Sequence, residues 1–302
     1  QVAGAGLRQS ADDLMTATER TLQTANGRFA ALHWQRPDAP RVLCLHGWLD
    51  NAASFIPMAP HLAAFDLVAL DFAGHGHSGH RPAGARYYMM DNVWDVDAVL
   101  DELGWDRCIM LGHSLGGVVA SSFAATAPER VSRLVTLDGL GALSARPEDT
   151  AERLRKSLRS IRKARGELKD YTDIDSAARA RQRASGLPIE AARLICERSL
   201  ERHGDVFRWC TDPSLNWHSP SLMTEEQVLN ILAAIEAPTL SIICNQVREW
   251  LNRDTTDQRR AVVPNCNHRD IDGHHHFHMD QPELTAGLII EFLEAGEPAN
   301  ER

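Results

Sequence analysis

The sequence predicts an α/β fold in which a mostly parallel, doubly wound sheet carries one inserted helical segment. Two observations predict it: short apolar runs alternate with helical patterns, and this alternation is interrupted once, between residues 138 and 238. The chain has 302 residues, which suits one large domain or a core domain with an insertion. Its 43% hydrophobic and 24% charged residues are typical of globular proteins and exclude a disordered or fibrous chain.

Five short apolar runs predict the strands. The runs are nearly continuous rather than alternating, as strands are when helices cover both faces of a parallel sheet. They lie at residues 41–46, 66–71, 107–113, 131–138 and 238–244.

The cysteines fit this interpretation. Cys44, Cys108 and Cys244 fall inside the predicted strands, where they are expected to be small buried residues rather than disulfide partners. None of the six cysteines forms a CxxC pair, so no zinc-finger spacing is present. A reduced, cytoplasmic protein is the simplest expectation.

Helical patterns fill the intervals between the strands. Residues 115–126 are small and apolar, and residues 283–293 place Leu284, Leu288, Ile289 and Phe292 at helical spacing. Residues 89–103 present one apolar face, made of Val93, Val96, Val99, Leu100 and Leu103. Strands that alternate with helices in this way indicate a parallel sheet.

The interruption predicts an inserted helical lid. Residues 189–200 follow Pro188, and residues 224–235 begin with the capping-box pair Thr224 and Gln227. A further helix near 153–165 surrounds an apolar stripe, Leu154, Leu158 and Ile161, with basic residues. The predicted organisation is a core over 27–139, a lid over 140–237, and the rest of the core over 238–295.

The charge distribution also separates this segment. The chain carries a net charge of −9, which argues against nucleic acid as a partner. Residues 146–203 carry a net charge of +5 and the rest of the chain −14. No run of 18 apolar residues occurs, so no integral membrane segment is predicted, and no secretory signal is predicted from the first residues.

The strongest chemical motif is Gly112-His113-Ser114-Leu115-Gly116-Gly117. It follows a predicted strand and opens a predicted helix, which is the setting of the G-x-S-x-G elbow. The turn raises the Ser114 hydroxyl above the sheet edge, and the flanking glycines avoid collisions with the neighbouring helix and strand. The Leu115 N–H lies at a helix N-terminus and can donate to an anion. A chance Gly/Ser turn is the alternative, which the setting disfavours.

A second motif, His46-Gly47-Trp48, directly follows the first central strand. In such sheets this loop supplies one oxyanion donor, so the backbone N–H groups of Trp48 and Leu115 are predicted to form an oxyanion hole. The Trp48 side chain lines the acyl pocket or merely packs, and the two are compatible because the predicted function uses the backbone.

A histidine-rich stretch, residues 273–283, supplies candidates for the base that activates Ser114. The base is expected late in the chain, in a loop before the last helix, and His274, His275, His276 and His278 all qualify. A metal cluster is the alternative, but consecutive loop residues point in divergent directions, so no metal site is predicted. His75 and His77, in a glycine-rich turn, are expected to be loop residues rather than ligands.

Together these stretches resemble the α/β-hydrolase superfamily, and most closely its serine hydrolase-like branch. The resemblance runs from about Gly27 to Phe292 and is weakest across the insertion. It implies a lidded hydrolase without a cofactor, acting on a small-molecule ester or related acyl compound. The stretches are LHGWLDNAASF (45–55), DFAGHGHSGHRP (71–82), GHSLGG (112–117), PERVSRLVTLDGLG (128–141) and GHHHFHMDQPE (273–283).

The resemblance also selects one histidine. In similar sequences the catalytic histidine is followed three residues later by another histidine and seven residues later by a proline. Counting back from Pro282 gives His275, with His278 as the companion. His274 and His276 remain alternatives.

The carboxylate that orients the catalytic histidine does not stand at its usual place in this sequence. Most relatives carry an Asp a few residues beyond the strand that follows the lid, and here Val247 stands at about that position. Asp138 ends the preceding strand and is the predicted acid, accepting a hydrogen bond from His275 Nδ1 and fixing its tautomer. Glu249 is the alternative acid; Asp138 would then only cap the turn into the lid.

The resulting hypothesis is a serine hydrolase that forms an acyl-enzyme on Ser114. A cofactor-free perhydrolase, a C–C bond hydrolase and a non-catalytic receptor on the same fold remain alternatives. A dehalogenase or epoxide hydrolase is disfavoured, because those reactions need a carboxylate at the position of Ser114.

Overall fold

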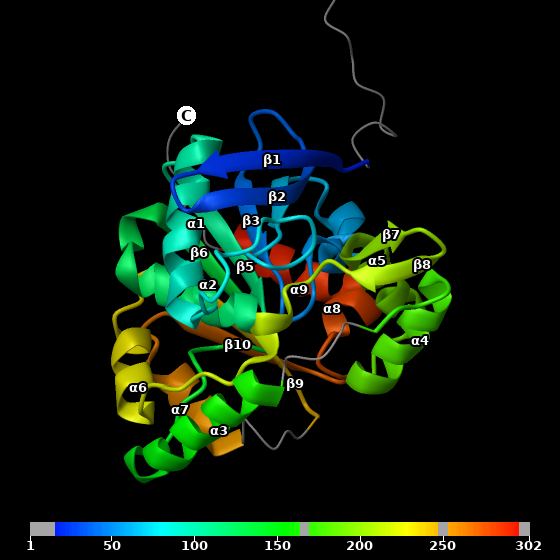
Figure 1. The fold of residues 1–302 in the computed structure, drawn as a ribbon. Helices are drawn as coiled ribbons and strands as arrows, with labels where there is room; N and C mark the ends of the chain where they lie inside the picture. Colours follow the sequence, from blue (N-terminus) through cyan, green and yellow to red (C-terminus); the bar gives the residue numbers. More distant parts are fainter. Residues whose placement is uncertain (1–15, 164–168, 247–252, 296–302) are drawn as a thin grey trace, which may run out of the picture.

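The computed structural model describes residues 16–163, 169–246 and 253–295, and its centre is an eight-stranded sheet (Figure 1). The strand order is β1-β2-β4-β3-β5-β6-β9-β10. β2 is antiparallel to β1 and β4, and the other neighbours are parallel. The strands are β1 (Thr18–Thr24), β2 (Gly27–Trp34), β3 (Arg41–Leu45), β4 (Asp66–Leu70), β5 (Cys108–His113), β6 (Val131–Leu137), β9 (Thr239–Cys244) and β10 (Cys266–Ile271).

Helices cover both faces of the sheet. One face packs against α1 (Met89–Leu103), α2 (Leu115–Thr126) and α6 (Glu225–Ala233). The other packs against η2 (Ala52–Phe55), η3 (Ala59–Leu62) and α9 (Pro282–Glu294). Within β3, Leu43 and Leu45 enter the first core while Val42 and Cys44 enter the second. Both sides of the strand are therefore apolar, which explains the continuous runs in the sequence.

The five predicted strands and the helices predicted at 89–103, 115–126 and 283–293 are confirmed, with shifts of one residue at some ends. β1, β2 and β10 were not predicted from the sequence. β10 is the edge strand CNHRDI, most of which is exposed, so it has no apolar run to reveal it. β1 is the opposite edge and is equally polar, TERTLQT.

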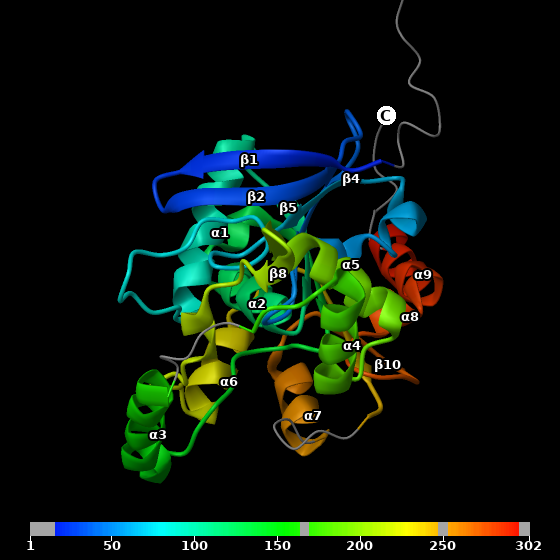
Figure 2. The same cartoon turned by 45° about the vertical axis from the view of Figure 1, so that its right-hand side comes forward.

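The segment between β6 and β9 contains more than helices (Figure 2). A short hairpin, unexpected from the sequence, turns at Gly204, which has a φ of 64°. α6 lies within the predicted lid range, and its Val228 and Leu232 also join the core beside α2. The remaining elements are α3 (Thr150–Lys163), α4 (Ile174–Ser185), α5 (Ile189–Ser199), β7 (Leu200–His203), β8 (Val206–Trp209) and η6 (Pro213–Asn216), and α7 (Arg253–Val262) follows β9.

The helices α4 and α5 form a small core of their own. It contains Ala178, Ala192 and Ile195, and Met279 of α8 (Phe277–Asp280) joins it. The insertion therefore packs directly against the histidine-rich stretch, residues 273–283.

All six cysteines lie in described segments and none forms a disulfide. Cys44, Cys108 and Cys244 are buried in β3, β5 and β9, as predicted. No helix in the described ranges combines the length and the apolar character needed to cross a membrane.

Candidate active site

Ser114 lies at the junction of β5 and α2, where the chain reverses sharply. Its φ of 52° and ψ of −115° form a strained conformation for a residue with a side chain. Its N–H donates to the Leu137 carbonyl at 2.9 Å, which anchors the turn to the end of β6. The structure thus has the elbow that the sequence predicted.

The glycines around Ser114 are sterically required, as predicted. A Cβ on Gly112 would lie 2.3 Å from the Gly116 carbonyl oxygen, and a Cβ on Gly116 would lie 1.9 Å from the Leu45 carbonyl oxygen. The second clash shows that the end of β3 touches the start of α2. The loop carrying Trp48 therefore adjoins the N-terminus that carries Leu115, the two residues predicted to supply oxyanion donors.

His275 bridges Ser114 and Asp138. Its Nε2 lies 2.8 Å from Ser114 Oγ, and its Nδ1 lies 2.6 Å from Asp138 Oδ2. The ring is 24% exposed and the Asp138 side chain only 1%. A carboxylate on Nδ1 holds the proton there and leaves Nε2 able to accept one from the serine.

Asp138 directly follows β6 and has a φ of 55°. Its N–H donates to the Ile242 carbonyl at 2.8 Å, and the Cys244 N–H donates to its Oδ1 at 3.4 Å. These contacts hold the carboxylate between β6 and β9 and direct Oδ2 toward His275. Glu249 and Val247 lie outside the described residues.

The other histidines of the cluster point elsewhere. His274 Nε2 lies 3.4 Å from Asp280, and His276 Nε2 lies 3.1 Å from Asp50 Oδ2. His278 is fully buried, and burial together with its histidine neighbours holds its pKa well below the ordinary value, so it is neutral. Of the four, His275 is the one that contacts Ser114.

A buried ionic network lies directly behind His275. His113, the residue before Ser114, donates from Nε2 to the His275 carbonyl at 2.8 Å. Asp50 contacts the His276 ring through one carboxylate oxygen and accepts from Arg181 of α4, at 2.6 Å, through the other. Burial alone raises the pKa of the Asp50 carboxyl, but His276, Arg181 and His113 outweigh it and hold the pKa well below its usual value. The network thus links β5, the base loop and the insertion through an ionised carboxylate.

Asp50, His113 and His276 also form the one group of metal-ligand type within the described ranges. Their ligand atoms lie within 4.8 Å of one another. However, Arg181 already neutralises one Asp50 oxygen, and His276 contacts the other. These donors form an ion-pair network, so we assign them no metal.

The loop after β3 is held by two neutral histidines. His46 donates from Nδ1 to the Gly47 carbonyl and accepts at Nε2 from the Phe72 N–H; burial lowers its pKa to about 4. His75 Nε2 accepts from the Leu49 N–H at 3.2 Å, and burial lowers its pKa to about 3. His75 is therefore a loop residue, as expected, but one that positions the segment beside Trp48.

Trp48 points toward the insertion. Its ring is 51% exposed, and its indole N–H donates to the Leu215 carbonyl at 3.2 Å. Asn51 donates to the Ile195 carbonyl and to Ser199, both at 2.8 Å. The insertion therefore reaches the loop after β3 from η6 and from α5.

A second buried ion pair fastens α5 to the core. Arg198 contacts both oxygens of Asp71, at the end of β4, and also binds Glu19 of β1 at 2.7 and 2.8 Å. Arg198 is 7% exposed and Asp71 fully buried. Because separating such a pair leaves a buried charge uncompensated, α5 is a fixed part of the molecule.

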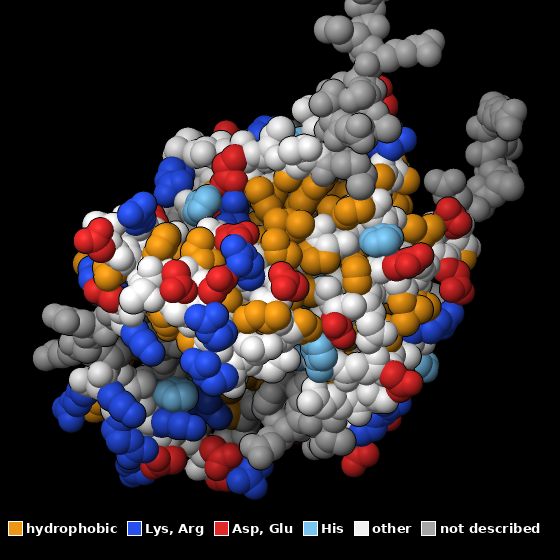
Figure 3. All heavy atoms as spheres, turned by 90° about the vertical axis from the view of Figure 1, so that its right-hand side faces the viewer, with side chains coloured by type: hydrophobic (Ala, Val, Ile, Leu, Met, Phe, Trp, Pro, Cys, Tyr) orange, Lys and Arg blue, Asp and Glu red, His pale blue; other side chains and the backbone are white. Residues whose placement is uncertain are grey.

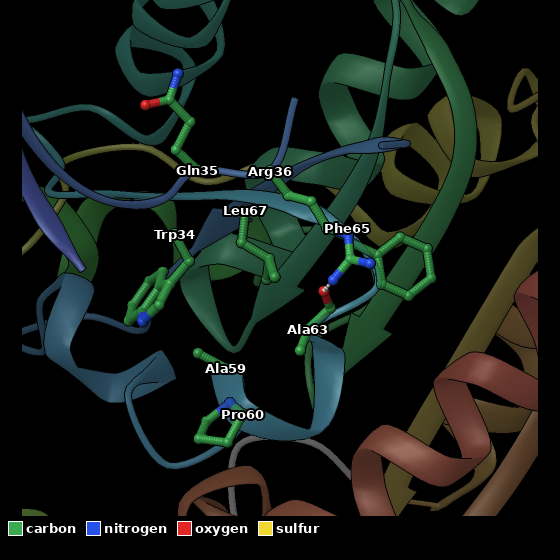
Figure 4. Close-up of a pocket in the computed structure, with 8 residues that line it drawn as sticks. All are labelled: Trp34, Gln35, Arg36, Ala59, Pro60, Ala63, Phe65 and Leu67. Atoms are coloured by element: carbon green, nitrogen blue, oxygen red, sulfur yellow. Dashed lines mark hydrogen bonds between the residues drawn. The ribbon is translucent and has the colours of Figure 1, made fainter. Parts of the chain in front are cut away.

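A small pocket lies away from these residues, near the amino-terminal end of β4 (Figure 4). Trp34, Pro60 and Leu67 line it, and Arg36 donates to the Ala63 carbonyl at its rim. It has room for about one water molecule. Ser114 lies at the opposite, carboxyl end of the parallel strands, where sites of such sheets form.

Comparison with known proteins identifies the family. A family model described as alpha/beta hydrolase fold matches residues 40–274. The chain belongs to the α/β-hydrolase family. Serine hydrolase-like protein 2 of Homo sapiens is 30% identical over 92% of this chain and 94% of its own length. The serine hydrolase-like protein of Danio rerio is 29% identical over 93% of this chain and 90% of its own.

A solved structure agrees with these relatives. A hypothetical protein from Pseudomonas aeruginosa PAO1 superposes with a TM-score of 0.85 at 33% identity, covering 92% of this chain and 99% of that one. This α/β hydrolase therefore belongs to the serine hydrolase-like branch, as the resemblance implied, and its activity is that of a hydrolase.

Sequence reasoning missed part of the site in this α/β hydrolase. It gave no role to Asp50, His113 or Arg181, although Asp50 lies within the 45–55 stretch that carries the resemblance. His276 was considered only as an alternative base. Nothing in the local pattern indicates that these residues meet, because Arg181 and Asp50 lie 131 residues apart.

Proposed function

We propose that this protein is a serine hydrolase that cleaves carboxylic esters or related acyl compounds. The observation that supports it is the hydrogen-bonded series from Ser114 Oγ through His275 to Asp138, with distances of 2.8 and 2.6 Å. A serine hydroxyl is a weak nucleophile at neutral pH, and a base held in the correct tautomer by a carboxylate is what activates it.

In the proposed reaction, Ser114 Oγ attacks the ester carbonyl carbon while its proton passes to His275 Nε2. Asp138 stabilises the imidazolium that forms. The oxyanion of the tetrahedral intermediate accepts hydrogen bonds from the Trp48 and Leu115 N–H groups. Collapse breaks the bond to the alcohol, which takes the proton from His275 and leaves an acyl group on Ser114. Water, activated by the same base, then attacks the acyl carbon and releases the acid.

We further propose that residues 140–237 supply the lid over this site, with 27–139 and 238–295 as the hydrolase core. Support comes from the contacts of Arg181 with Asp50 and of Leu215 with the Trp48 indole, which bring the insertion to the network beside the base loop and to the loop after β3. If the lid closes one side of the substrate pocket, turnover depends on the size of the acyl group.

The test is labelling with a fluorophosphonate, followed by mass spectrometry of the adduct. We expect one labelled serine, Ser114, with labelling abolished in Ser114→Ala. An adduct at another serine, or none on protein that hydrolyses esters, would overturn the assignment.

Turnover of p-nitrophenyl esters of increasing acyl length separates the remaining alternatives. His275→Ala is expected to lower turnover by several powers of ten, whereas His274→Ala is expected to be mild. Labelling without ester turnover would instead favour a C–C bond hydrolase or a receptor. A larger loss in His274→Ala or His276→Ala would show that the base is a different histidine.

A further inference from the structure

The helix α3 exposes the two leucines of its apolar stripe, whereas Ile161 is half-buried. Leu154 is 52% and Leu158 49% exposed. The side of α3 that faces the molecule is polar: Ser157 is buried, and Ser160 Oγ accepts from the His218 N–H at 3.0 Å. An amphipathic helix normally packs its leucines on the core, so this exposed stripe needs another explanation.

The rest of the helix surface is strongly basic. The single acidic residue within it, Glu152, contacts Arg155 and Arg159. This charge contrasts with the net −9 of the whole chain. Figure 3 shows that Lys and Arg side chains gather at the lower left of that face of the molecule. The six basic residues of α3 are Arg153, Arg155, Lys156, Arg159, Arg162 and Lys163.

We propose that α3 docks this protein onto an anionic lipid bilayer. Exposed leucines flanked by Lys and Arg are the features of a helix that lies in the interface, where the leucines enter the acyl boundary and the cations meet anionic headgroups. A second copy of the chain is a poorer occupant, because two α3 helices of equal positive charge repel each other. The location of α3 at the outer edge of the molecule leaves room for a flat surface (Figures 1 and 2).

The inner side of α3 is tied to the rest of the insertion. His218, which contacts α3 through Ser160, closely follows η6, whose Leu215 carbonyl accepts from the Trp48 indole. The helix is therefore held in place from behind while its leucines stay exposed. The docking itself does not depend on the catalytic roles proposed above.

The test is sedimentation with vesicles of phosphatidylcholine alone or mixed with phosphatidylglycerol. We expect binding to the mixed vesicles only, weakening as salt rises. The pair Arg155→Gln and Arg162→Gln, at i−3 and i+4 from Leu158, is expected to lower the partition coefficient by about 25-fold, roughly fivefold for each charge. The pair Leu154→Ser and Leu158→Ser is expected to lower it by a similar factor, because each half-exposed leucine loses its burial in the interface.

Matched controls keep the result interpretable. Arg179→Gln with Arg183→Gln removes the same charge from exposed positions on α4, and Leu284→Ser removes a leucine of 51% exposure on α9. These variants are expected to bind within twofold of the unaltered protein, and all variants to melt at an unchanged temperature. An equal loss of binding in the α4 pair would show that binding depends on the net charge of the protein and not on α3.

Three results would overturn the docking proposal. The first is no binding to mixed vesicles at low salt. The second is unchanged binding by both α3 pairs. The third is a concentration-dependent dimer, measured by analytical ultracentrifugation, that the Leu154→Ser and Leu158→Ser pair abolishes; it would assign the stripe to a second copy.

Discussion

Replacing Asp138 with Asn tests the geometry around His275 most directly. The side chain keeps its volume, but one carboxylate oxygen becomes an amide nitrogen. Because the Cys244 N–H donates to Oδ1, the amide oxygen of Asn is held there, and its nitrogen faces His275 Nδ1 in place of Oδ2. That nitrogen donates, so the favoured imidazole tautomer carries its proton on Nε2 and cannot accept one from Ser114.

The expected loss is roughly 10⁴-fold in kcat, equivalent to about 5.5 kcal/mol of transition-state stabilisation. The free energy of unfolding should change by less than about 1 kcal/mol, because no cavity is created and the Cys244 contact is kept. The assay is p-nitrophenyl ester hydrolysis across pH, with urea unfolding of the same preparation.

Two control substitutions sharpen the experiment. Asp280→Asn alters a 40% exposed carboxylate that faces His274 rather than His275, and it should leave kcat nearly unchanged. Glu249→Gln, outside the described residues, should also be mild. If Asp138→Asn keeps kcat within tenfold while Glu249→Gln abolishes it, the reasoning is refuted and the acid is Glu249.

Three further predictions concern stability. Arg181→Met leaves the buried Asp50 carboxylate without its cation and should lower the free energy of unfolding, measured in urea, by about 3 kcal/mol. Arg183→Met, at an exposed position on the same helix, should lower it by less than about 0.5 kcal/mol, and equal losses would contradict the network. Burial holds the pKa of His75 at about 3, against 6.5 for an ordinary histidine, so the stability present above pH 6.5 is lost as pH falls toward 3. From pH 7 to pH 5 this loss is about 2 kcal/mol, and His75→Gln should remove it from urea titrations at the two values. Gly116→Ala places a Cβ 1.9 Å from the Leu45 carbonyl oxygen of β3 and should prevent folding. Gly287→Ala, in open space on α9, should raise the free energy of unfolding, measured by thermal melts, by about 1 kcal/mol.

Much of the fold was accessible from the sequence because burial on both faces leaves a local trace. β3, β4, β5, β6 and β9 are central strands, and their apolar runs are contiguous in the sequence. β1, β7 and β10 lack such runs, since half or more of each strand faces solvent, and β8 is half-buried along its length. α6 was placed in the lid range because the strand–helix alternation is interrupted there, and its amphipathic pattern does not say which surface covers it.

The elbow was likewise a local property. Ser114, its flanking glycines and the strand and helix around them are contiguous, so their chemistry could be predicted before any contact was known. His275 was selected from neighbouring histidines by a resemblance in spacing, and the choice of Asp138 over Glu249 rested on the ends of parallel strands. The hydrogen bonds of His275 agree with both choices, while the catalytic roles remain predictions.

The sequence by itself determined which segments form the sheet, where the chain turns sharply at Ser114, and which family the chain resembles. Only the tertiary structure decided which histidine meets Ser114, which carboxylate meets that histidine, and that Arg181 reaches Asp50. Asp138 and His275 are separated by 137 residues, and Arg181 and Asp50 by 131. Local propensity and periodicity act over a few turns of helix or strand, whereas these contacts arise when separate segments converge at the carboxyl ends of the strands.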